Sequence, residues 1–177
     1  PRSYGKRGFS FMKVLICSDS HGLTEELIQL KKTHPDMDYY IHCGDSELDK
    51  DHSAIQGYHV VRGNCDFGND FPERDLIAAG NERIFITHGH RDHVKTSLMN
   101  LHYRAIEQNA TIVCFGHSHV LGVENIEGIL FINPGSIALP RMRKERTYVI
   151  LEINGKTKTV HVYEYGHGEL FQESYDI

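Results

Sequence analysis

Long apolar runs are missing from this sequence of 177 residues, and none approaches the ~20 residues that a membrane-spanning helix needs. The four cysteines are widely spaced without a CxxC pair, so they predict neither a disulfide framework nor a thiolate zinc site. A net charge of −5 leaves no basic excess for an extended nucleic-acid footprint. We therefore expect a reduced, cytoplasmic protein without membrane contacts, which could still bind a small phosphorylated ligand.

The length suits a single domain, and 40% apolar and 24% charged residues are typical of soluble globular proteins. Residues 1–11 are basic and lack the apolar core of a signal peptide. Met12 directly precedes the first strand pattern and is a candidate native start. We therefore treat residues 1–11 as an N-terminal extension, which is either native or added to the protein. Residues 12–177 are expected to form one domain, which no repeat or linker divides.

Strand and helix patterns alternate along the first two-thirds of the chain. We expect helices from Thr24 to before Pro35, over about 47–55 and over about 94–108, and strands at 13–17, 39–43, 58–61, 75–78, 83–87 and 111–115. Short strands follow at about 121–125, 129–132, 147–153 and 158–164, and the acidic tail Glu173–Asp176 reads as a frayed end. This order predicts an α/β fold with a mixed sheet and a second sheet packed on the first.

Five of the strand patterns end in polar clusters of one kind. These are Asp19-Ser20-His21, Gly44-Asp45, Gly63-Asn64-Cys65-Asp66, His88-Gly89-His90 and Gly116-His117-Ser118-His119. One such residue alone is usually a cap or a turn, but packing gives no reason for the pattern to recur. The carboxyl ends of strands converge on one crevice in open α/β sheets, so these side chains should meet. Their oxygen and nitrogen donors suit divalent manganese, iron, nickel, cobalt or zinc, and seven donors exceed what one tetrahedral site needs.

The ordered set of motifs resembles the calcineurin-like metallophosphoesterase superfamily. The compact length, Gly63-Asn64-Cys65-Asp66 and Asn133-Pro134-Gly135-Ser136 resemble its small bacterial and archaeal YfcE-type phosphodiesterases. The resemblance runs from about Met12 to Tyr163. It implies a four-layer α/β/β/α sandwich of two mixed β-sheets flanked by helices, with metal ions at one edge of the sheets.

The same resemblance implies two divalent ions. Manganese is the preferred candidate, and nickel, iron, cobalt and zinc are the alternatives. The first ion would be held by Asp19, His21, Asp45 and His119. The second would be held by Asp45, Asn64, His88 and His117, with Asp45 bridging. The implied reaction is hydrolysis of a small phosphate ester, in first place a diester, by a hydroxide that bridges the two ions.

Protonation of the leaving group is the least determined step. Many members of the superfamily have a histidine where this chain has Cys65, so Cys65 and His90 are the catalytic candidates. A packed thiol and a structural imidazole are the alternatives. Asn64 and His90 are also candidates for substrate binding, and Asp66 for orienting a metal ligand. The basic run at Arg141, Arg143, Lys144 and Arg146 is either a solvated connection or a phosphate contact.

Two further functions remain open. A phosphomonoesterase or nucleotidase would use the same site and differ in the shape of its pocket. A non-catalytic metal-binding scaffold would resemble the retromer subunit of this fold, although the retained His88, His117 and His119 disfavour it. A homodimer or a higher homo-oligomer is compatible with the sequence.

Overall fold

Side chains on strand β1 (Phe11–Cys17) alternate between two cores. In the computed structural model, which describes residues 11–177, Val14 and Ile16 belong to the core between two sheets. Leu15 and Cys17 point the other way and pack with helix α1 (Glu25–Thr33). Successive side chains of a strand face opposite sides, so a sheet that is apolar on both faces needs a cover on each.

The first sheet has six strands in the order β11-β10-β9-β1-β2-β3. Strands β2 (Tyr39–His42) and β3 (Tyr58–Val60) run parallel to β1. The antiparallel part consists of β9 (Thr147–Asn154), β10 (Thr157–Glu164) and β11 (Gly168–Asp176). The carboxyl ends of β1, β2 and β3 therefore lie along one edge of this sheet.

The second sheet has five strands in the order β4-β5-β6-β8-β7. Its parallel strands are β5 (Glu82–Thr87), β6 (Ile112–Cys114) and β8 (Ile129–Asn133). Antiparallel strands flank them, β4 (Arg74–Ala79) on one side and β7 (Gly122–Ile126) on the other. Helix α2 (Met99–Glu107) packs Leu101 and Ala105 against this sheet.

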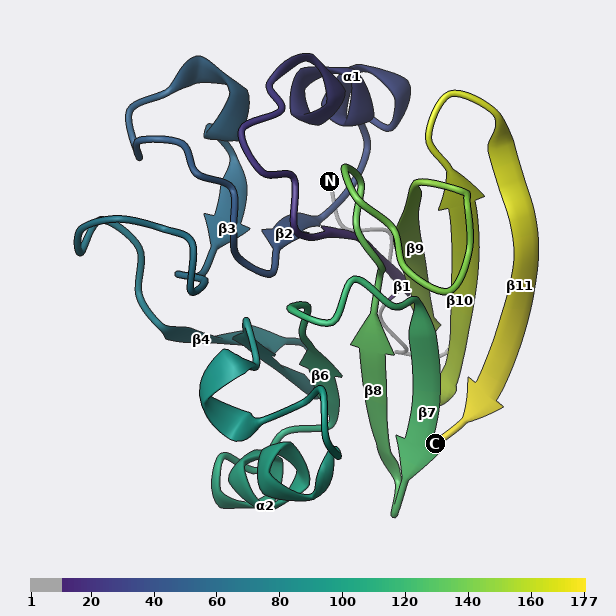
Figure 1. The fold of residues 1–177 in the computed structure, drawn as a ribbon. Coiled ribbons are helices and arrows are strands. Elements are labelled where there is room, and N and C mark those ends of the chain that lie inside the picture. Colours follow the sequence, from purple (N-terminus) through teal and green to yellow (C-terminus); the bar gives the residue numbers. More distant parts are fainter. Residues whose placement is uncertain (1–10) are drawn as a thin grey trace.

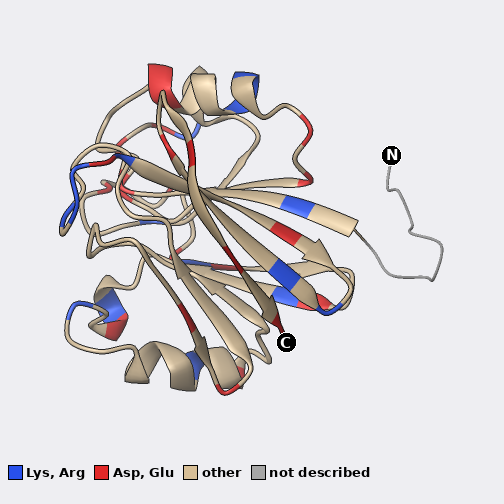
Figure 2. Cartoon of the chain, turned by 90° about the vertical axis from the view of Figure 1, so that its right-hand side faces the viewer, with Lys and Arg blue, Asp and Glu red and all other residues tan. Residues whose placement is uncertain are grey.

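Helices α1 and α2 lie on opposite outer sides of the paired sheets (Figure 1). The predicted four-layer sandwich is thus confirmed, with the largest core between the sheets and a smaller core beneath each helix. None of the helices described between residues 11 and 177 combines the length and the apolar character needed to cross a membrane. Basic and acidic residues are interspersed over the strands and loops (Figure 2).

Two of the predicted helices differ in extent from the prediction. The helix over about 47–55 is wrong, because only the short 3-10 turn η1 (Ser53–Ile55) forms there. The backbone N–H groups of Asp45 and Glu47 donate to Asp66 instead of supporting a helix. Helix α2 begins only at Met99, because the preceding chain forms the 3-10 turn η2 (His90–Asp92) and further turns.

The two ends of the described chain also differ from the prediction. The tail Glu173–Asp176 is not frayed but belongs to β11, which pairs with β10 along its length. Almost every β11 side chain is exposed, so the strand lacks the apolar alternation by which strands are recognised. Phe11 already belongs to β1, and the rest of the predicted N-terminal extension lies outside the described residues.

Candidate metal centre

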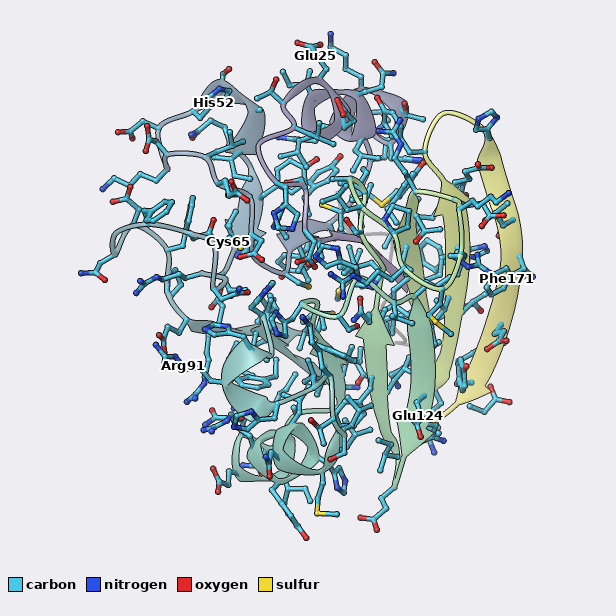
Figure 3. All side chains as sticks on the ribbon, in the orientation of Figure 1. Glu25, His52, Cys65, Arg91, Glu124 and Phe171 are labelled. Carbon is cyan, nitrogen blue, oxygen red and sulfur yellow. The ribbon has the colours of Figure 1, made fainter. Side chains whose placement is uncertain are left out.

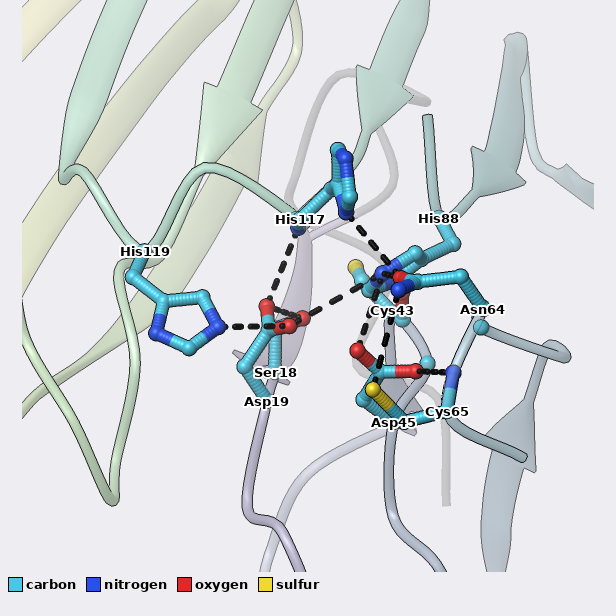
Figure 4. Close-up of polar contacts among 12 residues, drawn as sticks. Ser18, Asp19, Cys43, Asp45, Asn64, Cys65, His88, His117 and His119 are labelled. Atoms are coloured by element: carbon cyan, nitrogen blue, oxygen red, sulfur yellow. Dashed lines mark hydrogen bonds and ion pairs between the residues drawn. The ribbon is translucent and has the colours of Figure 1, made fainter. Parts of the chain in front are cut away.

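The seven candidate metal-binding side chains come together where five strands end, and Figure 4 labels all of them except His21. The first sheet contributes the residues after β1, β2 and β3, and the second contributes those after β5 and β6. They are Asp19, His21, Asp45, Asn64, His88, His117 and His119. The convergence predicted from the sequence is therefore present, with the donors of both sheets facing one another.

Asp19, His21 and His119 form one group of donor atoms. The Nε2 atoms of His21 and His119 lie 3.2 Å apart, and Asp19 Oδ1 lies 3.3 Å from His119 Nε2 and 3.9 Å from His21 Nε2. Asp45 Oδ2 lies 4.0 Å from His21 Nε2. These are the four residues predicted to hold the first ion.

A second group lies on the other side of Asp45. Asp45 Oδ2 is 3.2 Å from His88 Nε2, and Asn64 Oδ1 is 2.9 Å from the same nitrogen. Asn64 Oδ1 is also 3.1 Å from His117 Nδ1. One oxygen of Asp45 therefore faces both groups, as the predicted bridging role requires.

The orientation of three imidazole rings leaves their Nε2 atoms free for a ligand. His88 Nδ1 donates to the Cys43 carbonyl and His119 Nδ1 donates to the Leu139 carbonyl, both at 2.8 Å. His21 Nδ1 donates to Glu47 Oε1 at 2.6 Å. An acceptor at Nδ1 selects the tautomer whose Nε2 carries a lone pair, as in most metal-binding histidines. Sequence reasoning missed Glu47, because nothing in the local pattern shows that its side chain reaches His21.

The donor set fits divalent cations. Asp19 Oδ1 is buried without a well-aligned hydrogen bond among the described residues, and the Nε2 atoms of His21 and His119 face each other across 3.2 Å. An unpaired buried polar atom is costly, whereas a cation between these atoms satisfies all of them. Oxygen and imidazole donors are those that manganese, iron, nickel, cobalt and zinc accept.

Protonation of the histidines balances the same charges when no cation is bound. A hydrogen bond to Asp19 raises the pKa of His119 despite its partial burial. Burial opposes protonation of His88, but the hydrogen bond to Asp45 and the charge of Asp19 outweigh it and raise the pKa. Burial alone would raise the pKa of Asp19, yet the hydrogen bond to His119 and the charge of His88 hold it below its usual value. The site is built for positive charge.

Strained backbone holds several of the donors. Five of the seven have a positive φ, which only a few per cent of non-glycine residues adopt. They are Asp19 (54°), His21 (44°), Asp45 (59°), His117 (71°) and His119 (60°). Such strain costs about 1–3 kcal/mol per residue and persists where the surroundings over-determine the conformation, most often at functional sites.

The Asp66 carboxylate supplies part of that support. It accepts hydrogen bonds from the backbone N–H groups of Gly63 (2.7 Å), Glu47 (2.8 Å) and Asp45 (2.9 Å). It thus holds the backbone of a candidate ligand rather than a histidine ring. Gly63 lies so close to Asp45 that an added Cβ would be 2.0 Å from Asp45 Oδ1.

The motif Asn133-Pro134-Gly135-Ser136 braces the loops that carry Asp19, His117 and His119. The Asn133 side chain donates to the Gly116 carbonyl (3.2 Å) and to Ser118 Oγ (2.9 Å). Ser136 Oγ donates to the Asp19 carbonyl at 2.8 Å. Both side chains are buried, so this motif contributes to the shape of the site from beneath it.

The two catalytic candidates lie at the border of the donor groups. The His90 ring centre is 5.4 Å from that of His88 and 6.1 Å from that of His117, and its Nδ1 is buried without a partner among the described residues. Cys65 Sγ lies with donor atoms of His21 and Glu47 in a cluster whose members are all within 4.8 Å of one another. Cys65 lies in the loop that follows β3 (Figure 3).

Comparisons with known proteins identify the family of this chain. Residues 12–156 match the family described as the calcineurin-like phosphoesterase superfamily domain. The "Probable metallophosphoesterase YsnB" of Bacillus subtilis (strain 168) is 49% identical over 160 residues, which cover 90% of this chain and 95% of that protein. A conserved protein of Streptococcus pneumoniae TIGR4, described as a predicted phosphoesterase, has a TM-score of 0.90 at 32% identity and covers 94% of this chain and 98% of that one.

Two more distant structures share the fold. Vps29 of Entamoeba histolytica, solved with Zn²⁺, has a TM-score of 0.75 at 23% identity and covers 93% of this chain and 99% of that one. The E. coli phosphoesterase Yfce has a TM-score of 0.65 at 24% identity and covers 92% and 98%. The family match spans most of the chain, and the chain covers nearly the whole of its Bacillus relative. This chain is a member of the calcineurin-like phosphoesterase superfamily.

Proposed function

We propose that this chain hydrolyses a small phosphodiester with two divalent ions bound to the seven donors. The observation that carries the proposal is the position of Asp45 Oδ2, which is 3.2 Å from His88 Nε2 and 4.0 Å from His21 Nε2. When bound, such ions polarise phosphoryl oxygens and lower the pKa of water to about 7. Asp19, His21 and His119 would hold one ion, Asn64, His88 and His117 the other, and Asp45 both.

The protein residues would position the substrate and its protons. Burial, followed by the charge of His88, lowers the pKa of His90, so its imidazole is neutral at pH 7 and can donate one N–H to a phosphoryl oxygen. Burial and the charge of Asp45 raise the pKa of Cys65 to about 11, which makes its thiol a weak proton donor. We therefore favour His90 over Cys65 for contact with the phosphate or the leaving group, with Asn64 as the second substrate contact.

Manganese and a reducing compartment belong to the same proposal. The donors are oxygen and imidazole nitrogen, which suit manganese, while nickel, iron, cobalt and zinc are the alternatives. All four cysteines are free, and Cys17, Cys43 and Cys114 are buried, which supports a cytoplasmic location. A homodimer stays a prediction from the sequence.

The test uses metal-free protein reconstituted with manganese, nickel or zinc. Hydrolysis of bis(4-nitrophenyl) phosphate, a diester, is compared with that of 4-nitrophenyl phosphate, a monoester. We expect the diester to be the better substrate, and D45N and H88A to lose at least about 100-fold in kcat/KM. The matched control is H59A, which removes a half-exposed histidine whose Nδ1 lies 3.5 Å from Asp75. Loss of activity in H59A as large as in H88A would contradict the assignment.

A phosphomonoesterase is the nearest alternative, and preference for 4-nitrophenyl phosphate in the same assay would select it. A non-catalytic scaffold is the alternative from another class. The fold shared with Vps29 gives it some weight, but the complete donor set and the 49% identity with the Bacillus protein favour the enzyme. Wild-type protein that binds metal and is inert on both esters would select the scaffold.

A further inference from the structure

A cleft of about 580 Å³ lies next to the loop that carries His117 and His119. It opens between residues 94–98, strand β7 and residues 141–142, with Ser118 and Asn133 in its lining. Ligand pockets commonly have about 300–1,000 Å³, so the cleft has room for a ring-sized organic group beside the metal centre.

Backbone hydrogen bonds attach both sides of the cleft to the metal-binding motifs. On one side, the N–H of Arg141 donates to the His119 carbonyl at 3.0 Å. On the other, the N–H of Val94 donates to the Gly89 carbonyl at 3.4 Å, between His88 and His90. A group seated in the cleft is therefore held at a set position relative to the proposed reaction centre.

The lining combines apolar walls with basic side chains. Leu98, Leu121 and Val123 are only partly buried and offer apolar surface, above the buried rings of Phe115 and Phe131. Among the described residues of the lining, Lys95 and Arg141 are basic and Glu124 is acidic, so the cleft is net positive in a chain of net charge −5.

We propose that this cleft binds one ester group of the substrate, and that this group is an aromatic or heterocyclic ring bearing a second anionic substituent. The inference rests on the proposed phosphodiesterase function and specifies its substrate class. The apolar side chains of Leu98, Leu121 and Val123 contact the planar part, while Lys95 and Arg141 pair with the anion. A substrate with a second negative charge, in addition to that of the scissile phosphate, should therefore be hydrolysed more efficiently than one without it.

Two diesters that differ by one carboxylate test this inference. Methyl 4-nitrophenyl phosphate and methyl 3-carboxy-4-nitrophenyl phosphate release nitrophenols of comparable acidity. With manganese-loaded wild-type protein we expect kcat/KM to be about tenfold higher for the carboxylated diester, the size of one charge-assisted hydrogen bond. In the double variant K95Q/R141Q this ratio falls to near one.

The control variant is R143Q, from the same basic run. The Arg143 guanidinium lies over the Phe171 ring, 5.9 Å from its centre, rather than in the cleft lining. R143Q should keep the tenfold ratio. An active wild-type enzyme without preference for the carboxylated diester would overturn the inference and leave the phosphodiesterase proposal standing. An equal loss of preference in R143Q would also overturn it.

Binding of 5-hydroxy-2-nitrobenzoate, the phenol released from the charged diester, separates the two proposals. Calorimetry with metal-free protein should show binding that weakens about tenfold in K95Q/R141Q and is unchanged in R143Q. A wild-type protein inert on both diesters that still shows this pattern would contradict the phosphodiesterase function and support the cleft. If K95Q/R141Q binds the phenol as tightly as the wild type does, the proposed role of the cleft is refuted, whether or not the protein hydrolyses the diesters.

Discussion

Glu47 is expected to strengthen metal binding although it touches no metal-binding atom of the predicted set. Its Oε1 accepts the Nδ1 hydrogen of His21 at 2.6 Å, which orients the ring so that Nε2 faces Asp19. Carboxylates in this position are worth about 10–100-fold in metal affinity. The Glu47 side chain is 37% exposed, and water screens its charge, so we expect the lower end, about tenfold for E47A.

Calorimetric titration of metal-free protein with Mn²⁺ measures this effect. E47Q keeps an acceptor for His21 and removes only the charge, so its loss of affinity should be smaller than that of E47A. The matched control is E169Q, since Glu169 pairs with His161 on strands β10 and β11, away from the site. Wild-type affinity in E47A would refute the reasoning, and so would an equal loss in E169Q.

Three further predictions concern stability and the geometry of the site. Burial lowers the pKa of His42 to about 4, so the unfolded chain takes up a proton that the folded chain refuses. Its contribution to stability therefore falls as the pH drops from about 6.5 towards 4, by up to ~1.4 kcal/mol per pH unit, and urea unfolding of H42N should show a pH slope smaller by this amount than that of the wild type. G63A should bind Mn²⁺ at least about tenfold more weakly in calorimetry while its circular dichroism is retained, because the added Cβ displaces Asp45. E82A should lose about 1–3 kcal/mol in urea unfolding, since it removes one of two partners of the buried Lys158, whose Nζ lies 2.9 Å from Glu82 and also donates to the Ile177 oxygen, and wild-type stability would refute that account.

The convergence of the candidate donors was predictable because each of them belongs to a short local signal. A strand pattern that ends in a glycine and a polar residue can be read without the fold, as in Gly44-Asp45. The topology rule then places the ends of parallel strands together. All seven donors predicted in this way converge in the structure.

The supporting contacts were not predictable, because they depend on backbone conformation. The backbone of Glu47 has a φ of 56°, which lets its side chain reach His21. The Leu139 carbonyl accepts a hydrogen bond from His119, which lies 20 positions away in the sequence. No local pattern encodes either contact. Strand β11 escaped prediction for another reason, since its exposed side chains leave no apolar alternation to recognise.

The most direct test of the central claim is a crystal structure of the protein grown with Mn²⁺, with anomalous data that locate the metal. We predict two anomalous peaks that share Asp45 as a ligand. One also contacts Asp19, His21 and His119, and the other contacts Asn64, His88 and His117. A single peak, or peaks away from Asp45, would contradict the two-metal account.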